Sequence, residues 1–266
     1  MIRTTRLVLI FFATSAAAAP PRIVSINPCV DAVLMHVADP SQIAGISHYS
    51  KDSRASSITA AQAARFPATS GTAEEVVALA PDIVIAGAHV DPATIAALRR
   101  MNIGLLQLGV PDSIAESNIQ IRQIAAAAGH PDRGQRLVAR IDAAVNAAHT
   151  TGTPIPALIW QGGGLVPGTK TLADELLRTT GFHNLSADYG LKRWDVLPLE
   201  HLVARPPQVL FSVGDASGAD RMLSHPVFKP LAGHIAIRVY PVRLLHCGGP
   251  TIIDAVARLA QVRRAL

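Results

Sequence analysis

Two cysteines stand near opposite ends of the chain, and their thiols are the first side chains to consider for chemistry. Cys29 follows a short apolar segment, and Cys247 directly follows His246. In an oxidising compartment such a pair can form a disulfide, provided that the two Cα atoms come within about 7 Å. Two other outcomes stay open from the sequence, namely two free buried thiols or two side chains that contact a ligand.

Motifs of common enzyme classes are missing from the sequence or have the wrong spacing. The loop that begins at Gly163 resembles a phosphate-binding P-loop, but Thr169 stands between Gly168 and Lys170. The stretch 214–218 has the wrong spacing for the G-x-S-x-G elbow of a hydrolase. No H-E-x-x-H motif appears, and the cysteine and histidine spacing matches no structural zinc site. We therefore expect a protein that is not an enzyme.

A glutamate opens a short helical segment in each half of the chain. Glu74 and Glu200 each stand seven residues before a proline, Pro81 or Pro207, and each proline starts an apolar strand. A carboxylate in the first turn of a helix is favourable against the helix dipole, by roughly 0.3–1 kcal/mol. Two well-placed helix charges therefore explain the pattern without any function, although its repetition indicates two similar halves.

The first residues have the order of a cleavable secretory signal. Arg3 and Arg6 precede the apolar run Leu7 to Ala13, and small residues follow as far as Ala18. The apolar run is too short to span a membrane, and no cysteine near the cut offers a lipid attachment site. We expect a signal peptide over 1–18 and an exported protein that is not a lipoprotein. The remaining basic residues are scattered rather than clustered, which argues against nucleic acid as a partner.

Apolar segments of four to six residues alternate with helical segments, which favours parallel sheets covered by helices on both faces. Strands are expected at 23–26, 43–46, 68–69, 83–86, 103–108, 157–160, 209–212 and 237–240. Helices are expected at 31–37, 59–64, 74–80, 92–100, 113–128, 172–180, 199–204, 222–228 and 251–265.

A longer amphipathic helix is expected over Pro131 to His149, where Leu137, Ile141 and Val145 recur at four-residue spacing. We expect an α/β fold with two Rossmann-like α/β lobes, whose parallel sheets are joined by this one long rigid helix. The expected divisions are 19–130 for the N-terminal lobe, 131–150 for the linking helix and 151–266 for the C-terminal lobe.

These features together resemble the periplasmic solute-binding proteins of ABC importers, in the class that carries iron–siderophore complexes, haem and cobalamin. The resemblance rests on the order of several segments: Arg22-Ile-Val-Ser-Ile-Asn27, the two Glu…Pro units, Ala80-Pro-Asp-Ile-Val84 and Cys247-Gly-Gly-Pro250. It implies a monomeric periplasmic protein that captures a metal chelate, a ferric siderophore or cobalamin, between its lobes. It also implies delivery to a membrane permease dimer with its ATPase.

The resemblance assigns two kinds of site. Glu74 and Glu200 match the glutamates with which each lobe docks onto the permease, and the adjacent Glu75 is the weaker choice. Loops at the carboxyl ends of the strands should face the ligand. The expected ligand-binding residues are Cys29, Tyr49, Arg54, Trp160, Arg193, Trp194, His246 and Cys247. For each of them taken alone, a solvent-facing loop position or a place in the core is an equally good interpretation.

Two further possibilities concern the ligand. The cysteines and His246 could ligate haem iron or a soft metal, or the cysteines could form a bridge that restrains opening of the lobes. A relative that binds bare zinc or manganese would need three or four His, Asp or Glu side chains that converge from both lobes. The ten histidines are dispersed, which argues against such a metal site. We expect no cofactor of the protein's own, although the bound ligand can carry iron or cobalt.

Overall fold

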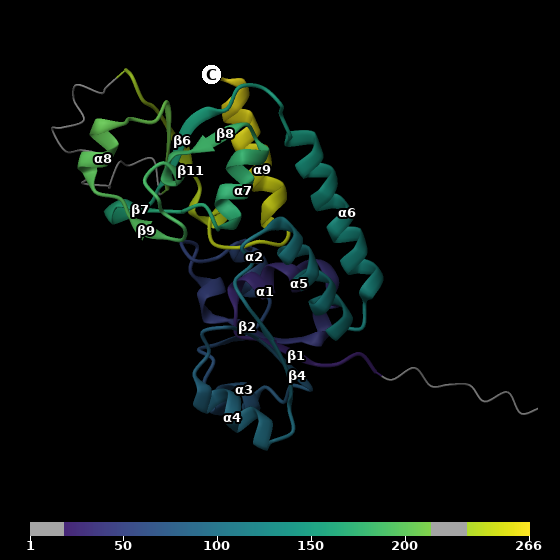
Figure 1. Cartoon of the computed structure of the whole chain (residues 1–266). Coiled ribbons are helices and arrows are strands. Elements are labelled where there is room, and N and C mark those ends of the chain that lie inside the picture. Colours follow the sequence, from purple (N-terminus) through teal and green to yellow (C-terminus); the bar gives the residue numbers. More distant parts are fainter. Residues whose placement is uncertain (1–18, 214–232) are drawn as a thin grey trace, which may run out of the picture.

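The computed structural model describes residues 19–213 and 233–266, and the expected signal peptide and the helix expected at 222–228 lie outside these ranges. Figure 1 shows two lobes, one above the other, with helix α6 (Pro131–Ala148) running along one side of both. The alternation of strands and helices thus gives the expected two-lobed α/β fold.

The N-terminal lobe is built on a five-stranded parallel sheet with the strand order β3-β2-β1-β4-β5. Its strands are β1 (Ile23–Ser25), β2 (Ile43–Ser47), β3 (Ala68–Thr69), β4 (Ile83–Gly87) and β5 (Gly104–Leu108). Its helices are α1 (Pro28–Val37), α2 (Ala60–Ala64), α3 (Ala73–Ala78), α4 (Pro92–Arg100) and α5 (Ile114–Ala127). Each of these strands was expected from the sequence to within two residues.

The C-terminal lobe contains a four-stranded parallel sheet, β11-β10-β6-β8, and a small antiparallel pair, β7 and β9. The strands are β6 (Ile155–Trp160), β7 (Leu165–Val166), β8 (Phe182–Asn184), β9 (Asp195–Val196), β10 (Val209–Val213) and β11 (Ala236–Tyr240). The helices are α7 (Leu172–Thr179), α8 (Leu199–Ala204) and α9 (Thr251–Arg264). Strands β7, β8 and β9 were not expected from the sequence.

One hydrophobic core runs through both lobes. It joins Ile23 and Ile85 of the lower sheet to Ile141 of α6 and to Ala157 and Ile159 of the upper sheet. Successive residues of a strand point to opposite faces, so the neighbouring residues on each strand serve a second, separate core in each lobe. Each sheet therefore uses one face to hold the lobes together and the other to stabilise its own lobe.

Helix α6 contacts α1 and α5 of one lobe and α9 of the other. Its N-terminal proline takes the first helical position, where the missing N–H would have had no helical partner. Gly134 allows α5 to come close, because a Cβ at this position would lie 2.5 Å from the Cβ of Ala125. The helix spans about 27 Å at ~1.5 Å per residue, enough to lie along both lobes.

Candidate functional site

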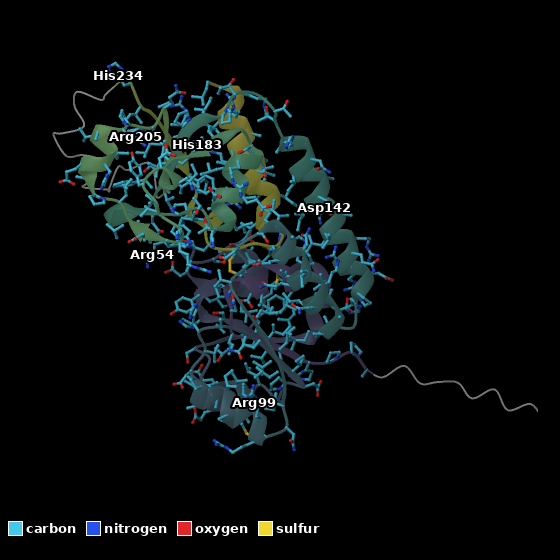
Figure 2. The ribbon with its side chains drawn as sticks, viewed as in Figure 1. Arg54, Arg99, Asp142, His183, Arg205 and His234 are labelled. Atoms are coloured by element: carbon cyan, nitrogen blue, oxygen red, sulfur yellow. A yellow bond between two sulfur atoms is a disulfide. The ribbon has the colours of Figure 1, made fainter. Side chains whose placement is uncertain are left out.

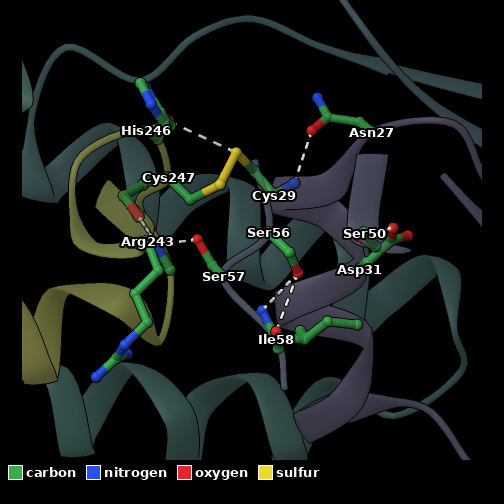
Figure 3. The surroundings of a disulfide bond; sticks show 12 residues. Asn27, Cys29, Asp31, Ser50, Ser56, Ser57, Ile58, Arg243, His246 and Cys247 are labelled. Atoms are coloured by element: carbon green, nitrogen blue, oxygen red, sulfur yellow. Dashed lines mark hydrogen bonds between the residues drawn. A yellow bond between two sulfur atoms is a disulfide. The ribbon is translucent and has the colours of Figure 1, made fainter. Parts of the chain in front are cut away.

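A disulfide joins the two lobes at the edge where their sheets face each other (Figure 3). Cys29 lies in the first turn of α1, and Cys247 lies in the loop that precedes α9. Their Cα atoms are 5.1 Å apart although 218 residues separate them in the sequence. Both sulfurs are used in this bond, so neither free thiols nor metal-ligating thiolates occur in this structure.

Hydrogen bonds between the lobes surround the disulfide. The Ser57 hydroxyl donates to the Arg243 carbonyl at 2.9 Å, and the Gly249 N–H donates to the Ser117 hydroxyl at 2.7 Å. The carboxylate of Glu175 in α7 accepts the N–H of Ile114, the first residue of α5, at 2.7 Å. The two lobes are thus held at close range. We refer to the turn His48–Lys51 and the segment 192–196 as the walls of the N-terminal and C-terminal lobes.

The wall of the N-terminal lobe is the tight turn His48–Lys51, which follows β2. The buried carboxylate of Asp31 in α1 reaches this turn from inside. One of its oxygens, Oδ2, accepts the Ser50 hydroxyl at 2.6 Å and the Ser47 N–H at 3.0 Å. The other oxygen, Oδ1, is buried and has no hydrogen-bond partner in the described structure. Burial raises the pKa of Asp31 to about 7, and the hydroxyls of Ser25 and Ser50 and the Ser47 N–H oppose this shift.

Two further contacts hold the same turn from its solvent-exposed side. The ammonium of Lys51 donates to the carbonyls of Ala63 and Phe66, where α2 ends. The His48 ring nitrogen lies 3.2 Å from the Thr69 carbonyl. Lys51 is therefore occupied as a helix cap and is not free to meet a ligand.

Tyr49 is the large hydrophobic side chain that this turn presents to solvent. It is 54% exposed, and its ring lies against that of His48 with the centroids 4.0 Å apart. Arg54 follows soon after and lies where the two lobes meet (Figure 2). Its guanidinium forms an ion pair with Asp52 at 3.0 Å. The turn thus exposes an aromatic ring, and the positive charge of the nearby Arg54 is already paired with the Asp52 carboxylate.

The wall of the C-terminal lobe is the segment Lys192–Val196, which lies against the Gly-rich loop after β6. Backbone N–H groups of Gly168, Thr169 and Lys170 donate to the carbonyls of the segment 191–193 at 2.8 to 3.0 Å. The approach is so close that a Cβ at Gly168 would lie 2.5 Å from the Arg193 carbonyl oxygen. This wall is therefore fixed by backbone contacts, which only glycine permits at this position.

Trp194 stands on this second wall and is 37% exposed. The neighbouring Arg193 reaches across to the other lobe, where its guanidinium lies 3.2 Å from the Asp112 carboxylate. A crevice of about 100 Å³ lies beside them. It is lined from the N-terminal lobe by the segment 110–112 and from the C-terminal lobe by residues that include Trp194 and His246.

His246 also lines a second cavity of about 70 Å³ behind the disulfide, next to Asn27, Cys29 and α5. Partial burial lowers the pKa of the His246 imidazole, which favours the neutral form that binds metal ions. His246 therefore lies between the lobes in the neutral form that a metal ligand requires. Burial lowers the pKa of His36 as well, and this residue lines another cavity between the lobes, next to Arg243 and Asp254.

Trp160 does not lie where we expected it. Its ring is fully buried in the core of the C-terminal lobe, together with Leu158, Val166 and Leu210. The reason is the alternation along β6, since Ala157 and Ile159 point to the core that joins the lobes and Leu158 and Trp160 point the other way. In this structure Trp160 presents no face to the space between the lobes.

The two expected docking glutamates lie in the first turns of α3 and α8, on different lobes (Figure 1). Glu74 and Glu200 are both exposed, and neither forms a hydrogen bond or ion pair within residues 19–213 and 233–266. The carboxylate of Glu75 instead accepts the Ser70 N–H at 2.6 Å and two hydroxyl groups. These bonds, led by the Ser70 N–H, lower the pKa of Glu75, so this residue has a structural role.

Sequence reasoning missed Asp31 and Gly168, which hold the two walls in place. Asp31 reads as a favourable charge in the first turn of a helix, and only its apolar neighbours Val30, Ala32 and Val33 hint at burial. Gly168 reads as one of several glycines in a flexible loop. Asp112 was missed as well, because its partner Arg193 is distant in the sequence.

Within the described part of the chain, no group of three or more His, Cys, Asp and Glu side chains is arranged to hold a metal ion. A search of the same residues found no helix with the length and apolar character that crossing a bilayer requires.

Comparison with known proteins gives a consistent result. Residues 23–240 match the family model described as periplasmic binding protein. A relative from Halobacterium salinarum called cobalamin-binding protein is 24% identical over 258 residues, which cover 91% of this chain and 69% of the relative.

Solved structures of similar fold include two periplasmic proteins. The haem-binding protein RhuT from Roseiflexus sp. RS-1, in its apo form, has a TM-score of 0.73 at 23% identity. The alignment covers 91% of this chain and 99% of RhuT. The vitamin B12-binding protein BtuF of Vibrio cholerae has a TM-score of 0.71 at 17% identity, and the alignment covers 92% of this chain and 98% of BtuF. At these identities, the likeness shows a common fold.

Proposed function

This chain belongs to the periplasmic binding protein family, and we propose that it captures a metal-bearing macrocycle between its two lobes and delivers it to an ABC importer. The family is one of binding proteins, in agreement with the lack of enzyme motifs. The proposed ligand is a corrinoid, with haem as the second candidate.

The observation that carries the proposal is a pair of exposed aromatic rings, one on each wall. Tyr49 follows β2 of one lobe and Trp194 directly precedes β9 of the other, and both keep a third or more of their surface exposed. Flat apolar rings of this kind pack well against the faces of a corrin or porphyrin. The site is thus suited to a ligand that is itself flat and largely apolar.

The crevice beside Trp194 is about 100 Å³, whereas pockets for small molecules usually measure about 300–1,000 Å³. The walls must therefore move apart on this side to admit a macrocycle, and the Arg193–Asp112 ion pair is the contact that has to open. The disulfide, which lies next to the crevice, and the shared core can stay in place while this ion pair opens.

Two features favour a macrocycle over the other ligands. Arg54 already pairs with Asp52 within its own lobe, which makes it a poor anchor for a strongly anionic ferric siderophore. A bare divalent metal would need a cluster of ligating side chains, and the described residues contain none. The neutral imidazole of His246 suits the axial position of iron or cobalt in a macrocycle. The names of similar proteins, which include cobalamin-binding and haem-binding proteins, support the same choice.

The test is equilibrium dialysis of the mature protein against cyanocobalamin, hemin and a ferric siderophore at concentrations of about 1 µM, the range of a moderate affinity. Saturable binding of cyanocobalamin at one molecule per protein, with weaker binding of the other two, is the expected result. Tyr49→Ala and Trp194→Ala should each weaken it. The control is Met101→Ala, which removes a similarly exposed apolar side chain beyond the end of α4. Saturable binding of the siderophore alone would contradict the proposal.

Delivery to the importer is the second part of the proposal. Glu74 and Glu200 lie on separate lobes and are unpaired among the residues that the structure describes, so they can meet two permease subunits at once. Charged contacts of this type mainly govern orientation and association rate. Cells that carry Glu74→Ala together with Glu200→Ala should lose uptake, while the purified variant still binds its ligand.

The matched control for this double variant is Asp132→Ala, which removes another first-turn carboxylate of a helix, on α6. Uptake by the control should equal that of the native protein. Normal uptake by the double variant would show that docking uses other residues.

A further inference from the structure

Asp31 is a buried carboxyl group that has no role in ligand binding as proposed above. It lies in the first turn of α1, and its side chain is fully enclosed. Helix dipole stabilisation needs only an exposed carboxylate in this turn, whereas burial of a carboxyl group costs free energy unless hydrogen bonds offset the cost. Helix stability alone therefore does not explain a buried carboxyl group at this position.

The two hydrogen bonds that the Asp31 side chain accepts from Ser47 and Ser50 lead to one place. A single oxygen accepts both the Ser50 hydroxyl at 2.6 Å and the Ser47 N–H at 3.0 Å, and these two residues bracket His48 and Tyr49. The turn between them is not part of a sheet, so no hydrogen bonds to a neighbouring strand hold it. The two bonds to Asp31 take their place. Figure 3 shows Asp31 and Ser50 close together beside the disulfide.

We propose that Asp31 is the positioning residue of the ligand-binding wall of the N-terminal lobe, which fixes the turn His48–Lys51 and thereby presents Tyr49 to the ligand. This inference rests on the proposed function for its consequence in binding, but the fixing of the turn stands on its own geometry. Asp31 touches no ligand in this account and acts through Ser47 and Ser50.

The other contacts of the turn cannot replace this one. Lys51 holds the far end of the turn to α2, and His48 holds its start to β3, both from the surface. Only Asp31 approaches from the core, where its two acceptor bonds are shielded from competition with water. Loss of its carboxyl group would leave the Ser47 N–H and the Ser50 hydroxyl without their buried acceptor.

The test compares Asp31→Ala with Asp31→Asn. Alanine removes the acceptor, whereas the carboxamide oxygen of asparagine can accept both bonds and its nitrogen takes the place of the unpartnered oxygen. Trypsin cleavage after Lys51 and Arg54 reports on the turn without any ligand. We expect this cleavage to be faster in Asp31→Ala by about tenfold, the effect of losing two hydrogen bonds, and to return towards the native rate in Asp31→Asn.

Cleavage after Arg99 and Arg100, in the last turn of α4, is the internal control (Figure 2). Equal acceleration at both sites would mean that Asp31 merely stabilises the whole lobe, and would overturn the proposal. Unchanged cleavage after Lys51 and Arg54 would overturn it too. Should Asp31→Ala fail to fold, Ser50→Ala removes only the 2.6 Å bond and should show the same local acceleration to a smaller extent.

Binding of cyanocobalamin and hemin supplies the second measurement. Asp31→Ala should weaken the binding of the compound that the native protein takes up by about tenfold, and Asp31→Asn by less than about threefold. If the native protein binds neither compound, the proposed function fails, and the cleavage experiment still decides whether Asp31 fixes the turn. Native affinity in Asp31→Ala would show that Tyr49 needs no such positioning.

Discussion

The two walls of the space between the lobes hold their aromatic side chains by different means. On the N-terminal wall, the turn that carries Tyr49 is fixed by side chains, with Asp31 inside and Lys51 outside. On the C-terminal wall, the segment that carries Trp194 is fixed by backbone hydrogen bonds to the loop at Gly168. One wall thus depends on an ionisable group, and the other depends on the absence of a side chain.

Because of this difference, the two walls should respond to different changes in conditions or sequence. The N-terminal wall should respond to pH and to changes of polar side chains, because its central acceptor is a carboxyl group with a raised pKa. The C-terminal wall should be indifferent to pH and sensitive to added volume, because a Cβ at Gly168 meets backbone atoms that cannot rotate away.

The disulfide joins the two lobes that carry the walls, and its removal should have the largest effect. Closing a loop of 218 residues stabilises the folded state by roughly 5 kcal/mol in the chain-entropy account. Cys29→Ser together with Cys247→Ser should lower the free energy of unfolding by a large part of this amount. Chemical denaturation measures the loss, and the native protein under reducing conditions should match the double variant. A loss below about 1 kcal/mol would show that the packed core alone sets the spacing.

The pH dependence of stability tests the N-terminal wall. The folded state holds the Asp31 proton up to a pKa of about 7, whereas the unfolded chain releases it near 3.8. Between these values the folded state binds more protons, so the Asp31 contribution to stability falls as pH rises and is constant above about 7. No charged side chain shares in this shift, which comes from burial opposed by Ser25, Ser47 and Ser50.

Asp31→Asn has no proton to release at this position. The stability of Asp31→Asn relative to the native protein should therefore rise between pH 4 and pH 8 by on the order of 4 kcal/mol, at ~1.4 kcal/mol for each unit of pKa difference. Thermal unfolding of both proteins across this range measures the difference. Parallel pH profiles for the two proteins would mean that Asp31 is ionised at its ordinary pKa.

Gly168→Ala tests the C-terminal wall. The new Cβ would lie 2.5 Å from the Arg193 carbonyl oxygen and 2.6 Å from its nitrogen, and overpacking of this kind costs about 1–3 kcal/mol. We expect a lower melting temperature and weaker ligand binding, with no dependence on pH. Gly162→Ala in the same loop is the matched control, because its Cβ would meet nothing within 4 Å. A native melting temperature for Gly168→Ala would show that this wall yields easily.

The ion pair between the walls should have the smallest effect. The Arg193 side chain is 70% exposed, and exposed pairs contribute about 0–1 kcal/mol. If the pair must open when a ligand enters, Arg193→Ala should leave stability unchanged and strengthen binding by up to about threefold. Arg54→Ala, which breaks a pair within one lobe, should leave binding unchanged. A clear loss of affinity in Arg193→Ala would show that Arg193 contacts the ligand.

The fold was accessible from the sequence because its elements have clear local signals. Helix α6 was expected over Pro131 to His149 and observed over Pro131–Ala148, since a starting proline and four-residue spacing both mark it. Helix α1 begins three residues earlier than expected, because the Asn27 side chain caps it and Pro28 fits its first turn. Short strands such as β8 were not predicted, because pairing with β6, rather than local preference, makes them strands.

The site was only partly accessible, since its residues meet through the fold. The sequence left the pairing of Cys29 with Cys247 open, because no pattern states how far apart two loops lie. Trp160 could have been assigned to the core by counting alternate residues along its strand from Leu158. The roles of Asp31 and Gly168 depend on contacts with Ser50 and Arg193, and no local signal in one sequence reveals such contacts.

The central claim is that both walls act on one ligand, and a double-variant cycle tests it most directly. Isothermal titration calorimetry would compare the native protein with Tyr49→Ala, Trp194→Ala and the double variant, using cyanocobalamin and hemin in separate titrations. An aromatic contact is worth about 0.5–1.5 kcal/mol, so each single variant should bind roughly two- to tenfold more weakly, and the double variant should lose both contributions. Native affinity in either single variant would show that the ligand meets only one wall, and would contradict the account.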